Sequence, residues 1–192
     1  RRPSDDSDDA TYTTQKKASS FESIYDDYTY GASGEIAAHV ARRSTLKFAA
    51  HFKHDVHRDH NLGEPERGMK DNTVSFGVEG FHQVTDKFSL EPGLSYNRRN
   101  SVQADDYNST TKAITPFPDN DNTAVNAQIG AVLAIDEKQG INLSVARKTR
   151  FAVMKDRYSY KMGAAIPNPD LKSEASINYD AGYFYNAPDG KV

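Results

Sequence analysis

The sequence has no cysteine and no tryptophan, and its apolar residues are few for a chain of 192 residues. Without cysteine it contains no disulfide framework and no thiol chemistry. Hydrophobic residues make up 36% of the chain, less than the ~45–50% typical of compact soluble domains. No run of ~18 apolar residues occurs, so the sequence predicts no membrane-spanning helix. The formal net charge of −3 argues against a nucleic-acid-binding surface.

The two ends of the sequence lack a signal peptide and a closing strand. Acidic residues follow Arg1 and Arg2, where a signal peptide would have its apolar core, and residue 1 is not methionine. Residues 188–192 are typical of a turn, with no strand after it. We therefore expect an internal fragment of a longer protein. Residues 1–27, rich in aspartate, serine and threonine, predict a polar loop or disordered terminus ahead of a β domain over residues 28–192.

What the sequence does contain is period-two alternation. Leu46, Phe48 and Phe52 alternate with Thr45 and Lys47. Such alternation predicts a strand with one apolar face and one face in water. Comparable segments occur at 32–40, 45–53, 73–79, 88–97, 125–135, 141–145 and 176–185. The sequence thus predicts an all-β protein with about seven strands.

Short turns and long polar segments alternate between these strands. The turns lie at 42–44, 85–87 and 136–140, and the polar segments at about 55–71, 100–122 and 148–172. Outer-membrane barrels have short periplasmic turns and longer extracellular loops. The layout therefore predicts an antiparallel meander in a transmembrane β-barrel. A soluble sandwich with one packed face and one solvated face is the alternative.

Aromatic and basic residues are expected near the long-loop ends of the strands. Aromatic side chains there would form a girdle at the membrane interface. Basic side chains there would attract anionic ligands or pair with loop carboxylates. The aromatic residues are Tyr28, Tyr30, Phe52, Tyr96, Tyr183 and Tyr185, and the basic residues are Arg98, Arg99, Arg147, Lys148 and Arg150.

One histidine-rich segment is a candidate metal site. Histidine recurs every third residue, at His51, His54, His57 and His60. Imidazole is a ligand for zinc, copper and iron. On a strand, successive members of this series point to opposite faces. A site made by His54, His57 and His60 therefore requires the chain to leave the strand near Val56, and a solvated strand end is the other interpretation. No catalytic arrangement and no cofactor motif is present, so we predict neither an enzyme nor a cofactor.

Residues 165–174, Ala-Ile-Pro-Asn-Pro-Asp-Leu-Lys-Ser-Glu, resemble the NPDLKPE signature in the barrel of TonB-dependent outer-membrane receptors. Residues 145–151 resemble that family's strand leading into an R-x-P loop, and residues 177–183 resemble its NYELGY return strand. Ala152 and Ser173 stand where the family has proline. We expect the motif residues to organise a loop and set strand register. They are Arg150, Asn168, Pro169, Asp170, Leu171 and Glu174.

The resemblance implies that the predicted strands are a partial wall of a large transmembrane β-barrel. It also implies a receptor in the bacterial outer membrane that imports a scarce nutrient, such as a ferric siderophore or a similar iron complex. It implies energy supplied by the TonB complex through a plug domain that is missing from this chain. Outer-membrane lipid and a small nutrient ligand would be its other partners, with no nucleic acid. The loops at about 55–71, 100–122 and 148–172 would bind the ligand. A passive porin or adhesin barrel and a soluble β-sandwich binding module are the alternatives.

Overall fold

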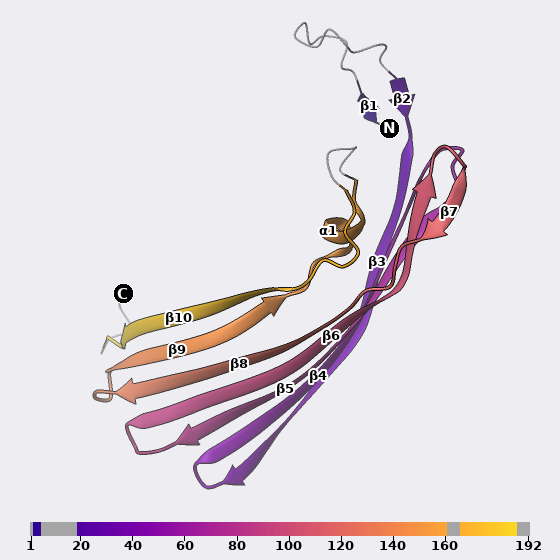
Figure 1. Ribbon diagram of the computed structural model, residues 1–192. Helices are drawn as coiled ribbons and strands as arrows, with labels where there is room; N and C mark the ends of the chain where they lie inside the picture. Colours follow the sequence, from indigo (N-terminus) through magenta and orange to yellow (C-terminus); the bar gives the residue numbers. More distant parts are fainter. Residues whose placement is uncertain (1, 5–18, 161–165, 188–192) are drawn as a thin grey trace, which may run out of the picture.

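The computed structural model describes residues 2–4, 19–160 and 166–187, and its main feature is a curved antiparallel sheet (Figure 1). It has seven long strands, and each one after the first pairs with the long strand before it. They are β3 (Ser23–Ala41), β4 (Ser44–Asn61), β5 (Arg67–Gln83), β6 (Phe88–Asn108), β8 (Asp121–Ala134), β9 (Gln139–Arg150) and β10 (Glu174–Tyr185). The predicted antiparallel meander of about seven strands is confirmed.

Three shorter strands and one helix accompany the sheet. β7 (Ala113–Pro116) folds back on the end of β6, and β1 (Arg2–Ser4) pairs with β2 (Ser19–Phe21). The helix α1 (Met154–Tyr158) lies in the connection between β9 and β10. No helix among the described residues is long and apolar enough to cross a membrane.

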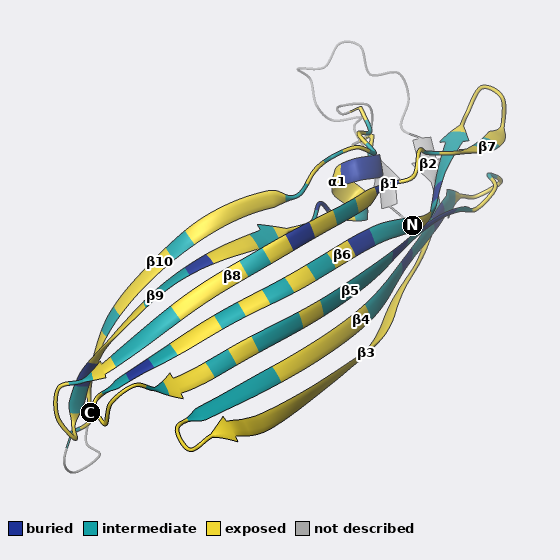
Figure 2. Cartoon of the chain, turned by 60° about the horizontal axis from the view of Figure 1, so that its bottom comes forward, coloured by how far each residue is buried: buried dark blue, intermediate teal, exposed yellow. Residues whose placement is uncertain are grey.

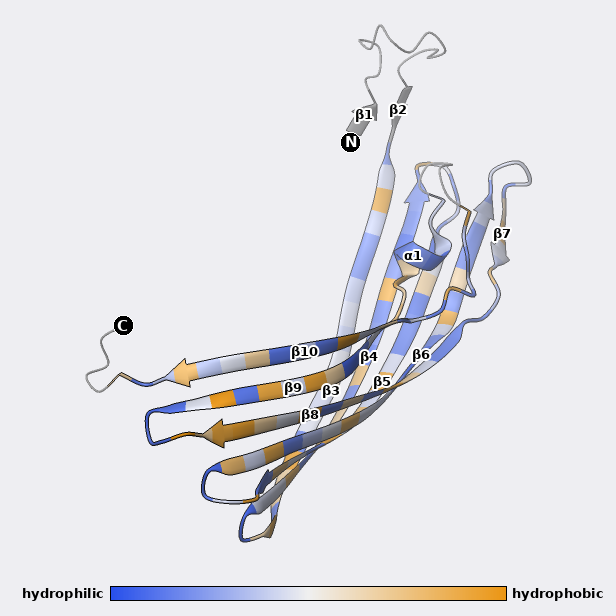
Figure 3. Cartoon of the chain, turned by 60° about the vertical axis from the view of Figure 1, so that its left-hand side comes forward, coloured by the Kyte–Doolittle hydropathy of each residue, from blue (hydrophilic) through white to orange (hydrophobic). Residues whose placement is uncertain are grey.

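The strand register gives the sheet two chemically different faces. Phe48 pairs with Ile36 on one side and Val78 on the other, and the row continues through Leu94 and Ala127. We call the face that carries this row the apolar face. On the opposite polar face, Lys47 pairs with Glu79, and its Nζ lies 2.9 Å from Glu35 Oε2. Because side chains alternate along each strand, apolar and hydrophilic residues alternate in Figure 3.

Nothing in the described part of the chain covers the apolar face. Phe48, Leu94 and Ile129 are 47%, 53% and 47% exposed, and Figure 2 shows exposed positions along every long strand. The buried hydrophobic cluster is small, consists of Met69, Ala104 and Tyr158, and lies on the polar face. A soluble sandwich needs a second layer over the apolar face, and the described residues form no such layer.

The apolar residues of the apolar face form a band that slants across the strands. In β4 the band runs from Leu46 to Phe52, whereas in β9 it runs from Ile141 to Val145. The register connects β4 to β9 through four strand pairs. Along this path the band in β9 lies four to six residues closer to the short turns than the band in β4. With ~3.3 Å per residue and ~4.8 Å between strands, this shift corresponds to a strand tilt of roughly 40°. Strands of outer-membrane barrels have such a tilt.

Two of the three predicted loops are largely strand. β4 continues to Asn61 and β5 begins at Arg67, so residues 62–66 alone connect them in place of a loop over 55–71. Within the predicted loop 100–122, β6 continues to Asn108. Toward the long-loop end, beyond the apolar band, neither face of these strands carries a continuous apolar row, so the alternation disappears although the backbone pairing continues. In the third segment, 148–172, the described residues between β9 and β10 are loop apart from α1.

Two further predictions need correction. Residues 23–27, predicted as polar terminus, belong to β3, whereas residues 1 and 5–18 lie outside the described residues. Tyr183 and Tyr185 lie at the short-turn end of the sheet, because β10 runs from the long loop toward the short turns. They therefore do not belong to a girdle at the long-loop end.

Gly140 is a position where the sheet leaves no room for a side chain. A Cβ atom there would lie 2.5 Å from Phe184 Cζ and 2.7 Å from the carbonyl oxygen of Leu133. Phe184 is the direct partner of Gly140 in the register of β10 and β9. The ring can turn aside, but the backbone oxygen cannot, so Gly140→Ala is expected to destabilise the protein by about 1–3 kcal/mol.

Urea unfolding of the full-length protein in lipid vesicles, followed by circular dichroism, measures this loss. Gly34→Ala is the matched control, because a Cβ at Gly34 meets nothing within 4 Å. That control is expected to stay within about 0.5 kcal/mol of the wild type. Equal effects of the two substitutions would contradict the packing at Gly140.

Candidate functional site

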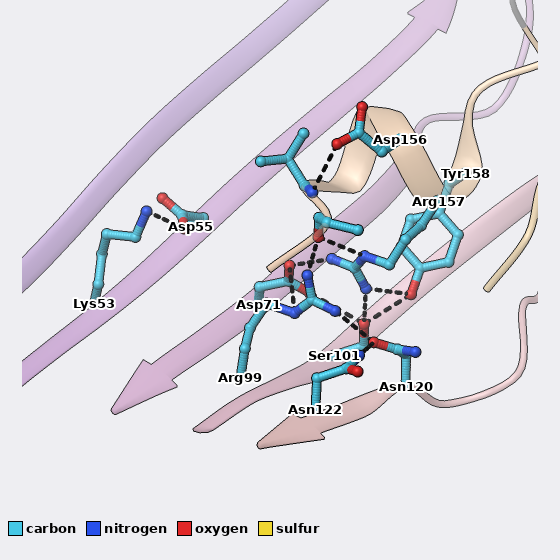
Figure 4. Close-up of polar contacts among 12 residues, drawn as sticks. Lys53, Asp55, Asp71, Arg99, Ser101, Asn120, Asn122, Asp156, Arg157 and Tyr158 are labelled. Atoms are coloured by element: carbon cyan, nitrogen blue, oxygen red, sulfur yellow. Dashed lines mark hydrogen bonds and ion pairs between the residues drawn. The ribbon is translucent and has the colours of Figure 1, made fainter. Parts of the chain in front are cut away.

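A buried polar network lies on the polar face near the long-loop end, where α1 covers β5 and β6 (Figure 4). Its charged members are Asp71 of β5, Arg99 of β6 and Arg157 of α1, which are 4%, 4% and 0% exposed. Ser101 and Tyr158 complete it, and we call these five residues the arginine cluster. Charged residues are rarely buried this deeply unless they are paired. The fold must therefore hold these charged side chains next to their partners.

The strand register brings the β5 and β6 members of the cluster together. Asp71 pairs with Ser101, and Thr73 pairs with Arg99. The next pair joins Lys70 to Gln103, so the register shifts and Val102 is an extra residue in β6. Such a β-bulge bends its strand and increases its twist, and this one lies directly beside the arginine cluster.

Arg157 joins the helix to both strands. Its Nη1 donates hydrogen bonds to Ser101 Oγ and Tyr158 Oη, each at 2.7 Å, and its Nε donates to the carbonyl oxygen of Ala152 at 3.2 Å. Its Nη2 pairs with the carboxylate of Asp71. The guanidinium also lies 4.6 Å from the centre of the Tyr158 ring, a cation–π distance. All three nitrogens of this buried guanidinium therefore have partners.

Arg99 extends the network into the neighbouring loops. Its Nη1 donates to the Ala152 carbonyl oxygen, and its Nη2 donates to Asn120 Oδ1 at 2.5 Å. Asn120 Nδ2 in turn donates to the carbonyl oxygen of Pro169 at 2.6 Å. The cluster thus connects two strands, the start of β8 and both sides of the loop that contains α1.

The electrostatics of the cluster are asymmetric, because two guanidinium groups share one carboxylate. Arg99 Nε lies 3.8 Å from Asp71 Oδ2 and makes no hydrogen bond. Burial, and then the charge of Arg157, lower the pKa of Arg99. Arginine stays protonated all the same, and unpaired buried ions cost several kcal/mol. The cluster is therefore stable only while Asp71 and both guanidinium groups keep their partners.

The motif residues close the loop that carries α1. Arg150 faces Glu174 in the strand register, with Arg150 Nη1 3.4 Å from Glu174 Oε2 and Arg150 Nη2 3.0 Å from Asp156 Oδ2. The backbone N–H of Asn168 donates to the carbonyl oxygen of Arg157 at 2.7 Å. Pro169 contacts Asn120 as described above. Leu171 is half-buried and Asp170 is exposed.

The structure does not bring the predicted metal-binding histidines together. His54, His57 and His60 all lie in β4, which pairs with β3 and β5 across Val56. His57 therefore points to the face opposite His54 and His60. His54 Nδ1 lies 2.6 Å from Asn72 Oδ1. Among the described residues, no group of three or more histidine, aspartate or glutamate side chains is placed to hold a metal ion.

Other charged residues of the polar face at the long-loop end also pair with one another. Lys53 Nζ lies 2.8 Å from Asp55 Oδ2. Arg67 donates from Nε and Nη2 to the two carboxylate oxygens of Asp59, at 2.6 Å each, and this hydrogen bonding raises the pKa of Arg67. A molecule that approaches this end of the polar face meets both signs of charge in ordered pairs.

The basic residues predicted as one group are divided between the two faces. Arg98 and Arg147 lie on the apolar face, where Arg98 pairs with Asp121 and Arg147 donates to the Val125 carbonyl oxygen. Arg99 lies on the polar face in the arginine cluster. Sequence reasoning missed Asp71 and Arg157, which are 86 residues apart. No local pattern relates two residues at that separation.

Comparison with known proteins now identifies the fold. The family model described as TonB dependent receptor-like, beta-barrel, matches residues 2–191. The chain belongs to this family. Membership of this family, predicted from the motif over residues 165–174, is therefore confirmed. The family is one of receptors rather than enzymes.

One solved structure similar to this receptor chain is "The FrpB iron transporter from Neisseria meningitidis (F3-3 variant)". The two share a TM-score of 0.63 at 16% sequence identity, over 83% of this chain and 26% of that one. The chain thus spans about a quarter of the length of that transporter. At this identity the similarity establishes a common fold. A search of curated protein sequences found no match.

Proposed function

We propose that the chain is part of the wall of an outer-membrane receptor that imports an iron complex, such as a ferric siderophore, with energy from TonB. The observation that carries the proposal is the family match over residues 2–191. The name of FrpB as an iron transporter favours iron over other nutrients. TonB would act through a plug domain outside this chain.

The slanted apolar band supports the membrane location. Uncovered apolar side chains such as Phe48 and Ile129 would contact lipid, at about 25 cal/mol for each Å² removed from water. The polar face would line the barrel interior. A porin or adhesin would use the same wall, but the family match favours a receptor. A soluble β-sandwich would require a second layer of structure over the apolar face, and the described residues form no such layer.

The arginine cluster gives the long-loop end a specific part in this function. It holds α1 against the polar face, so α1 and the described residues beside it would stand on the interior side of the wall. A rigid wall with ordered loop elements is a suitable site for ligand recognition. We propose that this loop and the ends of β4 to β6 contact the ligand.

Uptake of radiolabelled iron complexes tests the proposal. A strain that lacks the full-length receptor is expected to lose uptake of one ferric complex and to regain it on complementation. A strain that lacks TonB is expected to lose the same uptake, which distinguishes an energised receptor from a passive pore. Recovery of the full-length protein in the soluble fraction, rather than in outer membranes, would contradict the proposal.

A further inference from the structure

Four side chains of β3 and β4 form an ordered cluster on the apolar face of the sheet. Tyr28 and Tyr30 lie nearly parallel, with ring centres 6.4 Å apart and an angle of 15° between the ring planes. The ring of His54 lies 4.9 Å from that of Tyr30. The guanidinium of Arg58 lies 5.5 Å from the centre of the Tyr28 ring, a cation–π distance. We call these four residues the tyrosine platform.

The tyrosine platform lies beyond the apolar band, toward the long-loop end. The band in β4 ends at Phe52, and the register pairs Tyr30 with His54 and Tyr28 with Val56. The Tyr28 row is therefore four residues beyond the band, roughly 10 Å at ~3.3 Å per residue and a strand tilt of roughly 40°. The long-loop end of such barrels is extracellular. With the band in the hydrocarbon, the platform stands at the level of the outer-leaflet headgroups.

The charge of the platform is neutralised by carboxylates beside it. Arg58 donates from Nη1 to Asp26 Oδ2 at 3.2 Å and from Nη2 to Tyr28 Oη at 3.3 Å. Its Nε lies 3.9 Å from Glu66 Oε1. The carboxylate of Asp26 is 59% exposed, so it can still accept a further hydrogen bond. A guanidinium with two carboxylate partners attracts a phosphate only weakly, so the platform suits an uncharged polar ligand.

Both tyrosines are accessible, with Tyr28 42% and Tyr30 56% exposed. Aromatic rings of a membrane girdle lie at the edge of the hydrocarbon, as Tyr96 does at the end of the band in β6, whereas the platform lies farther out. Acyl chains therefore do not account for it. A sugar ring has an apolar C–H face that packs on aromatic carbon and hydroxyl groups that pair with planar polar side chains.

We propose that the tyrosine platform binds a core sugar of the outer-leaflet glycolipid. The C–H face of the sugar packs on Tyr28 and Tyr30, and a hydroxyl group donates to the carboxylate of Asp26. The outer leaflet of a bacterial outer membrane consists of glycolipid, whose core sugars lie just outside the hydrocarbon, at the level of the platform. The inference rests on the proposed membrane location, but not on the identity of the transported ligand.

Titration of the purified full-length receptor in detergent, followed by native mass spectrometry, tests this site. The two probes are lipopolysaccharide that ends after its core sugars, and lipid A, which has the acyl chains and their phosphates but no core. The wild type is expected to bind the first probe roughly tenfold more tightly, as expected for contacts with two aromatic rings. The double variant Tyr28→Ala/Tyr30→Ala is expected to lose this preference and to keep its affinity for lipid A.

Two control variants are expected to keep the preference. Tyr96→Ala removes a ring that is 43% exposed on the same face but lies at the end of the band. Lys70→Gln removes a charge from the same face, beside Val56, and so tests attraction of core phosphates. Absence of binding, equal binding of the two probes by the wild type, a preference that survives in the double variant, or its loss in Lys70→Gln would each overturn the proposal. Membrane fractionation shows separately whether the receptor is inserted, so failure of the sugar site and failure of the proposed barrel are distinguishable.

Discussion

Arg157→Met is expected to release the loop between β9 and β10 from the sheet. Arg157 is fully buried and pairs with Asp71, and methionine keeps an unbranched side chain and a similar helix propensity without the charge. Asp71 would then be left with one hydrogen bond from Ser101 Oγ at 3.1 Å and with Arg99, whose Nε is 3.8 Å away. Removal of one partner from a buried ion pair typically costs about 3–5 kcal/mol. A helix of five residues has too little stability of its own to compensate.

Hydrogen exchange of the full-length receptor measures this release. The amide of Asn168 donates to the Arg157 carbonyl oxygen, and the amide of Leu171 donates to the Asn168 carbonyl oxygen. Both amides are expected to lose protection by on the order of a hundredfold or more, since about 1.4 kcal/mol corresponds to a factor of ten.

Arg150→Met is the matched control for this experiment. Arg150 precedes the same helix and has two ion-pair partners, Asp156 and Glu174, but its side chain is 59% exposed. Exposed ion pairs contribute about 0–1 kcal/mol, so protection of the two amides is expected to fall less than about fivefold. Equal loss of protection in both variants would show that burial of Arg157 is not what fixes the loop.

The sheet could be predicted because the apolar band imposes a period of two on the sequence. Beyond the end of the band, the sequence shows no alternation from which a strand could be predicted. In β4 the alternation is clear from Leu46 to Phe52, and the strand then continues to Asn61 through residues that are polar except for Val56. Pairing of backbone groups extends β4 and β5 beyond the band, but any polar side chain is acceptable there. The predicted loop over 55–71 was wrong for this reason.

The candidate site could be predicted only where a motif marks it. Residues 165–174 identify the loop and its family, and the structure places Arg150 opposite Glu174 at the base of that loop. The arginine cluster itself depends on the bulge at Val102 and on contacts between residues far apart in the sequence. Arg157 lies in a segment that looks like an ordinary polar loop, and its burial is decided by the fold rather than by its neighbours.

Ile129→Arg is expected to destabilise the receptor in a lipid bilayer by about 2–4 kcal/mol, the cost of an arginine near the middle of the lipid-facing surface of a barrel. Ile129 lies midway along the apolar band in β8, between Pro92 and Val145 of the adjacent strands. Urea unfolding in lipid vesicles, followed by circular dichroism, measures the change.

Gln128→Arg is the matched control, since Gln128 is the preceding residue, is also exposed, and lies on the polar face. In a water-filled interior the new charge stays solvated, so a change within about 1 kcal/mol is expected.

The native arginines of the apolar face lie where a charge on the lipid-facing surface costs little. Arg98 comes after the last apolar residue of the band in β6, Tyr96, and Arg147 comes after Val145 in β9, so both stand at the edge of the band where the cost of charge falls toward zero. If Ile129→Arg and Gln128→Arg were equally tolerated, the apolar face would not contact hydrocarbon, and the slant of the band would have to arise from packing against another protein.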